Sequence, residues 1–118
     1  MRKLAFIIIP ILTITSCTNH SEEDLTDPLV LGNTKFATDV KPIIDNNCIS
    51  CHANVPQFGA PMPLTSLEAV KEAIINRNLI GKISRPDGAP GLMPFGGPRL
   101  PQNSIDKIVD WKNSGYLE

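Results

Sequence analysis

The feature that most constrains this chain is the run Cys-Ile-Ser-Cys-His at residues 48–52. Two cysteines separated by two residues occur in structural zinc sites, in redox-active dithiols and in local disulfides, among other sites. A structural zinc site needs four ligands, and the only further cysteine and histidine are Cys17 and His20 near the N-terminus. A thioredoxin-like dithiol requires strands alternating with helices, and the chain has no alternating strand pattern of useful length. A disulfide within the run stays possible, but it leaves the histidine unused.

The histidine directly after the second cysteine favours covalent attachment of haem. The thiols of Cys48 and Cys51 would add to the two vinyl groups on one side of the macrocycle, and a two-residue gap in a helical turn places both sulfurs along that edge. His52 would then give an imidazole nitrogen to the iron. The run therefore predicts one covalent haem c per chain.

The second axial ligand is expected to be a methionine, because a thioether favours ferrous iron and raises the reduction potential. Met93 lies in the Gly- and Pro-rich segment 91–97, which is placed to pass over the face of the ring opposite His52. Met62 follows the histidine closely, so its loop is expected on the histidine side. The alternatives are His20, an open position that would bind gases or peroxide, and the ordinary role of methionine in core packing. We therefore expect the iron to be held by His52 and Met93.

The N-terminus has the pattern of an export signal. Residues 1–3 are cationic, residues 4–14 are mostly apolar, and small residues precede Cys17, as in a secretory signal peptide. The apolar stretch is too short to cross a bilayer as a permanent helix. Residues 14–17 resemble the bacterial lipobox, in which a small residue precedes a cysteine that is lipidated and becomes the first residue of the mature chain. This resemblance implies a signal peptide over residues 1–16 and a lipid anchor on Cys17, which would place the protein in the bacterial cell envelope on the periplasmic side or at the cell surface.

The rest of the chain is short of side chains that form a core. Ten apolar residues fall within residues 1–16, and five aromatic residues lie beyond them. Of the 8 glycines and 11 prolines, ten crowd into residues 81–101. A long irregular segment in a compact domain usually surrounds a ligand or another functional site, so the composition indicates a large non-protein core. We expect the lipidated cysteine and a flexible linker over residues 17–33, and one folded domain over residues 34–118.

The folded part is predicted to be all-α. Apolar residues recur at helical spacing in three segments, which are residues 37–47, 66–77 and 102–114. Thr38 is the expected N-cap of the first, with Pro42 in its first turn. Thr65 and Glu68 form a capping box for the second, and Gly115 is the expected stop of the third.

Over residues 35–117 the chain resembles the class I c-type cytochromes. The cysteine run, the segment 36–44 before it, and Met93 with the helical segment after it correspond to the family's haem motif, N-terminal helix, methionine loop and C-terminal helix. The resemblance implies an all-α cytochrome c fold with long loops around the haem, in which the first and last helices cross. At that crossing it places Val40, Ile44, Ile108 and Trp111. The chain departs from the family at Pro101, where a serine or threonine usually caps the last helix.

Five further residues are candidates for supporting roles around the haem. A metal-bound histidine usually donates its other ring N–H to a carbonyl or a carboxylate, and the resemblance implies a proline carbonyl, from Pro61 or Pro63. Lys82 and Arg85 are candidates to pair with a haem propionate, with a solvated surface charge as the alternative. Trp111 is expected in the core, near the haem edge.

Together these expectations describe a membrane-anchored single-haem electron carrier, not an enzyme, that cycles between Fe(II) and Fe(III). Its partners would be a redox donor, a redox acceptor and the lipid membrane, and the chain is expected to be a monomer. With 11 basic and 12 acidic residues, the charge balance argues against binding to nucleic acid. The alternatives are a haem enzyme or ligand sensor with an open distal site, and an accessory haem subunit of a larger respiratory or oxidoreductase complex.

Overall fold

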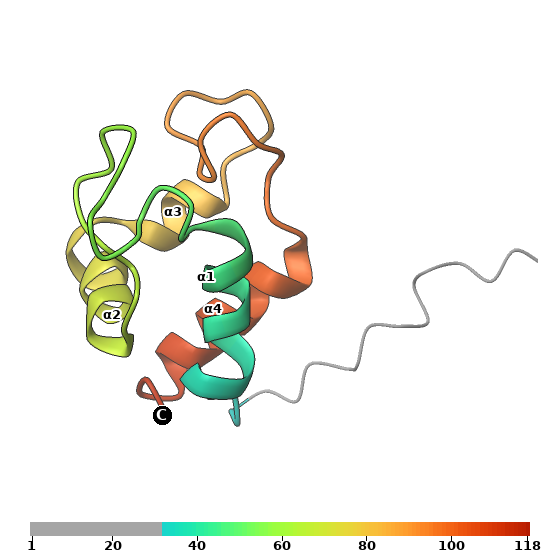
Figure 1. The fold of residues 1–118 in the computed structure, drawn as a ribbon. Coiled ribbons are helices and arrows are strands. Elements are labelled where there is room, and N and C mark those ends of the chain that lie inside the picture. The colour runs from blue at the N-terminus through green and yellow to red at the C-terminus, as the bar shows by residue number, and fades with distance from the viewer. Residues whose placement is uncertain (1–31) are drawn as a thin grey trace, which may run out of the picture.

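The computed structural model describes residues 32–118, and in this part of the chain every regular element is a helix. The elements are η2 (Phe36–Val40), α1 (Lys41–Asn47), α2 (Leu67–Asn76), α3 (Leu79–Ile83) and α4 (Gln102–Asn113). The predicted all-α class is therefore confirmed for these residues (Figure 1). No helix within residues 32–118 has the length and apolar character needed to cross a membrane. The predictions for residues 1–31, including Cys17 and His20, lie outside the described residues.

The first predicted helix is a continuous helical segment that opens with a π-helical turn. η2 begins at Phe36 after an extended Lys35. The N–H of Val40 donates to the carbonyl of Lys35, five residues back, at 3.2 Å, which is the wider spacing of a π turn. Pro42 follows and has no N–H to continue the ladder. The wider turn therefore lies where the regular hydrogen-bond pattern has to be interrupted.

Two predicted N-caps are wrong in position. Thr38 lies inside the π-helical turn, and its hydroxyl donates to the carboxylate of Asp39 at 2.7 Å. In α2 the cap is Ser66, not Thr65, because Ser66 is the residue with extended backbone, and its hydroxyl accepts the N–H three residues further on at 3.3 Å. The hydroxyl of Thr65 donates instead to Asn54. An N-cap needs extended backbone directly before the first helical residue, and the sequence alone did not locate that residue.

α3 was not predicted, while α4 agrees closely with its prediction. α3 has five residues, which is too short to show a helical repeat. It follows Asn78, whose positive φ of 54° turns the chain sharply after α2. α4 ends at Asn113, and Gly115 with φ of 84° terminates it as expected.

The N-terminal helical segment packs on α4 and forms the centre of the core. The rings of Phe36 and Trp111 lie 5.3 Å apart. Trp111 is fully buried, and its indole N–H donates to the carbonyl of Leu117 at 2.7 Å. The four residues expected at the crossing all belong to this buried cluster, namely Val40, Ile44, Ile108 and Trp111.

A buried carboxylate on α4 holds the beginning of the described chain. Asp110 is 6% exposed and accepts the N–H of Gly32 at 2.9 Å and the hydroxyl of Thr34 at 2.5 Å. These bonds, led by the Thr34 hydroxyl, hold the pKa of Asp110 below its ordinary value. The chain therefore enters the domain on the side where it also ends (Figure 1).

Candidate functional site

The cysteine run begins at the C-terminal end of α1, and main-chain hydrogen bonds hold the turn that follows. Cys48 is the C-cap residue, and its N–H donates to the carbonyl of Ile44 at 2.8 Å. The N–H groups of Cys51 and His52 then donate to the carbonyl of Cys48, at 3.1 Å and 2.9 Å. The two thiols and the imidazole are thus borne by one hydrogen-bonded turn on the end of a helix.

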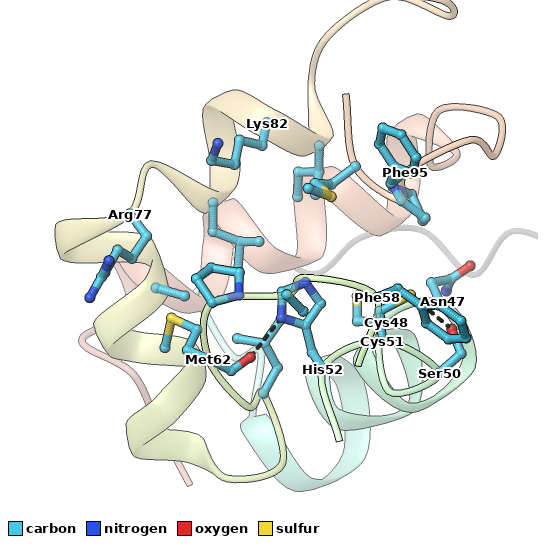
Figure 2. Close-up of a pocket in the computed structure, with 18 of the residues that line it drawn as sticks. Asn47, Cys48, Ser50, Cys51, His52, Phe58, Met62, Arg77, Lys82 and Phe95 are labelled. Atoms are coloured by element: carbon cyan, nitrogen blue, oxygen red, sulfur yellow. Dashed lines mark hydrogen bonds between the residues drawn. The ribbon is translucent and has the colours of Figure 1, made fainter. Parts of the chain in front are cut away.

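This turn forms part of the wall of a cavity of about 430 Å³. α2, α3 and the segment 93–95 supply other parts of the wall. The four residues predicted to attach or coordinate a haem all line this one cavity, namely Cys48, Cys51, His52 and Met93. Most of the remaining wall is apolar, as in a typical small-molecule site of this size. Figure 2 shows Cys48, Cys51 and His52 in this cavity.

The imidazole is oriented by a main-chain carbonyl. Nδ1 of His52 lies 2.8 Å from the carbonyl oxygen of Met62 (Figure 2). The tautomer that makes this bond carries its proton on Nδ1 and donates it, which leaves Nε2 free to act as a ligand. The expected acceptors were Pro61 or Pro63, and the structure corrects this to the residue between them. Met62 precedes a proline and is therefore biased to an extended conformation, in which successive carbonyls point in different directions.

The two methionines are held in different ways. The loop of Met62 is tied to the histidine by the bond just described, as expected from its position in the sequence. The N–H of Met93 donates to the carbonyl of Lys82 at 3.2 Å, which ties the second loop to α3. Both methionines are partly buried and both line the cavity.

Among the residues that the structure describes, two cations line the cavity, and only one of them was predicted. Lys82 was a candidate from the sequence, whereas Arg77 was missed. Arg77 is the C-cap residue of α2, where a cation is an ordinary helix-terminal feature, so the sequence carried no signal for it. Its Nε lies 3.5 Å from Oε1 of Glu72. The other candidate, Arg85, is not part of the wall, because its guanidinium donates to the carbonyl of Pro90.

Three aromatic residues differ in their relation to the cavity. Trp111 is a core residue, as expected, and does not line the cavity. Phe58 and Phe95 do line the cavity, yet they are 87% and 85% exposed. They therefore stand at its rim, and Phe58 does so on backbone with φ of 51°.

Cys48 and Cys51 are free thiols and are not joined to each other. Burial, with a smaller contribution from Cys51, raises the pKa of Cys48 to about 11. Within residues 32–118 no group of three or more histidine, cysteine or acidic side chains is arranged to hold a metal ion. The described residues therefore do not form a structural zinc site of their own.

The fold and the site define a small helical domain whose cavity is lined by two thiols, an oriented imidazole and the two methionines Met62 and Met93. Comparison with protein-family models, curated proteins and solved structures finds no match to this chain.

Proposed function

We propose that this chain is a single-haem c-type cytochrome that carries electrons. The observation that supports the proposal is that Cys48, Cys51, His52 and Met93 line one cavity, although Met93 is far from the others in sequence. Two thiols for covalent attachment, an imidazole and a thioether form the donor set of a haem c with His/Met ligation. A disulfide or a two-thiol redox site would use neither the imidazole nor the thioether.

The residues present fit such a group in three respects. The cavity of about 430 Å³ has a mostly apolar wall, which suits a flat apolar macrocycle. The bond from His52 to the Met62 carbonyl leaves one imidazole nitrogen for a metal. Both thiols are free for thioether formation. When bound, the haem would supply a one-electron Fe(II)/Fe(III) couple.

The protein's own residues would attach, orient and enclose the group. Cys48 and Cys51 would bind it covalently, and α1 would fix the position of that edge. His52 and Met93 would both hold the iron and so leave no position for a substrate. A site with both positions filled supports an electron carrier rather than an enzyme or a gas sensor.

The wider proposal includes the fold family and the location. The packing of the segment 36–47 on α4 supports a cytochrome c fold, in which first and last helices cross. Lipidation of Cys17 would anchor the domain to a membrane of the bacterial envelope, with residues 18–33 as its tether. A redox donor and an acceptor would exchange electrons with the anchored domain.

The test begins with production of the full chain in a host competent for c-type maturation. Intact-mass measurement and the pyridine haemochrome assay should show one covalent haem per chain. Cys48→Ala or Cys51→Ala should leave a single, weaker attachment or none, and His52→Ala should not assemble a low-spin site. A wild-type chain without haem from this host would refute the proposal.

A matched pair of variants tests the sixth ligand. Met93→Ala should abolish the methionine-to-iron charge-transfer band of the oxidised protein and allow the ferrous form to bind carbon monoxide rapidly. Met62→Ala is the control and should keep the band, because Met62 supports His52 through its main-chain carbonyl. Loss of the band in Met62→Ala alone would reassign the ligand, and a wild-type protein without the band would support the open-site alternative.

A further inference from the structure

The cavity has a charged end and an uncharged end. Among residues 32–118, Arg77 and Lys82 are the only permanently charged residues in its wall, and no acidic residue of this part of the chain lines it. Figure 2 shows both cations on the side away from Cys48 and Cys51. A ligand that fits this wall is therefore apolar along most of its body and anionic at the end remote from the thiols.

The positive charge at this end is only partly neutralised by the protein. Arg77 uses Nε to approach Glu72 at 3.5 Å, and both of these side chains are substantially exposed. Within residues 32–118 the terminal nitrogens of Arg77 have no hydrogen-bond partner, and the ammonium of Lys82 has none either. A guanidinium fork with free N–H groups and an ammonium are the side chains best suited to bind carboxylates.

We propose that Arg77 and Lys82 form the carboxylate-binding end of this cavity and pair with the haem propionates. The proposal deepens the proposed function and rests on it. Haem carries its vinyl groups on one side and its two carboxylates on the other, so attachment at Cys48 and Cys51 directs the carboxylates toward the two cations. Arg85, held by the Pro90 carbonyl outside the wall, has no part in this pairing.

The pairing has a consequence that can be measured on the reduction potential. A positive charge near the carboxylates offsets their negative charge, and it disfavours the oxidised state, which carries one more positive charge. Arg77 and Lys82 are therefore positioning and charge-compensating residues, not ligands. Their neutralisation should lower the potential while the attachment and the axial ligands stay in place.

The experiment compares Arg77→Gln and Lys82→Gln with Arg85→Gln in the full haem-loaded chain. Arg85→Gln is the matched control, since it removes the same charge from a residue that does not line the cavity. Each of the first two variants should shift the oxidation equilibrium by about threefold to tenfold, which is roughly 30 to 60 mV for a one-electron couple. The control should shift it by less than half as much. Arg77→Lys should recover part of the shift.

Resonance Raman spectra provide a second measurement, which a change in the overall charge of the protein does not alter. The bending vibration of the haem propionates should change in Arg77→Gln or Lys82→Gln and stay unchanged in Arg85→Gln. Equal potential shifts in all three variants, or propionate vibrations unaffected by all three, would overturn the pairing. Haem content distinguishes failure of the proposed function from failure of the carboxylate pairing. A wild-type chain without covalent haem refutes the proposed function. Normal haem content with the null results above refutes only the carboxylate pairing.

Discussion

The cavity is so large for this domain that, under the proposed function, the chain without haem is expected to lose its tertiary structure. The perturbation is to produce the same chain, thiols intact, in a host without c-type maturation. A cavity of about 430 Å³, left dry and unrelaxed at about 24 cal/mol per Å³, would cost roughly 10 kcal/mol. That figure is an upper limit, because Phe58 and Phe95 stand exposed at the rim and water can enter between them. Small domains have only about 5 to 15 kcal/mol of stability in total.

Water entry does not rescue the haem-free chain. The wall includes the apolar side chains of Leu64, Leu79 and Ile83, which are at most 6% exposed. Filling the cavity with water would hydrate these side chains, and closing it would require the irregular segments 48–66 and 84–101 to repack without partners. Either course removes much of the free energy of unfolding.

Three measurements test this expectation, of which the first two compare the haem-free and haem-loaded chains and the third uses the haem-free chain, where Cys48 keeps its thiol. Near-ultraviolet circular dichroism reports on Trp111, which is fully buried and packs edge-on against Tyr116 at 4.9 Å. Urea titration reports on cooperativity. Alkylation at pH 8 reports on Cys48, whose pKa burial raises to about 11 in the folded arrangement, so that it reacts slowly there and at an ordinary rate in an unfolded chain. A haem-free chain with a near-native dichroism spectrum, a urea midpoint close to that of the loaded protein and a slow Cys48 would refute the reasoning.

Three further predictions concern the haem-loaded protein. Trp111→Phe removes the indole bond to the Leu117 carbonyl and part of a buried ring, and should lower the free energy of unfolding by about 1 to 3 kcal/mol in urea titrations; an unchanged midpoint would contradict this. Ile108→Ala should cost about 2 to 5 kcal/mol because Ile108 is fully buried, whereas Ile75→Ala, at a position 59% exposed, should stay within about 0.5 kcal/mol. The lowered pKa of Asp110 means that its contribution is present above the ordinary value of 3.8 and is lost as the pH falls through the lower folded value. Asp110→Asn should therefore flatten the acid limb of the stability–pH profile, and an equally steep limb would show that other carboxylates dominate it.

Some parts of the fold could be read from local patterns. The apolar repeat and Gly115 predicted a helix over residues 102–114, and α4 occupies Gln102–Asn113. The capping residues were harder, because Thr65 and Ser66 are chemically alike and only the backbone conformation decides which one caps α2. α3 could not be predicted, since its five residues are helical only because Asn78 turns the chain and because Leu79 and Ile83 are buried against the rest of the domain.

The candidate site likewise has one part that follows from the local sequence and another part that depends on the folded chain. The run at residues 48–52 names three of its donors by itself, because a spacing of two residues within one turn is a local property of the chain. The position of Met93 in the cavity wall depends on the folded chain, since the N–H of Met93 donates to the carbonyl of Lys82 in α3, and its role as a ligand stays a prediction. The carbonyl of Met62 differs from its predicted neighbours only in direction, which depends on how the loop is folded.

The limit of prediction from the sequence is clearest at the charged end of the cavity. Arg77, Lys82 and Arg85 are three cations within nine residues of sequence, and nothing local distinguishes them. By itself the sequence determined the helical class, the thiols and the imidazole, because these follow from periodicity and from spacing within one turn. The contact of the Met62 carbonyl with His52, and the presence of Met62, Met93, Arg77 and Lys82 in one cavity wall, depend instead on how α2, α3 and the loops pack together.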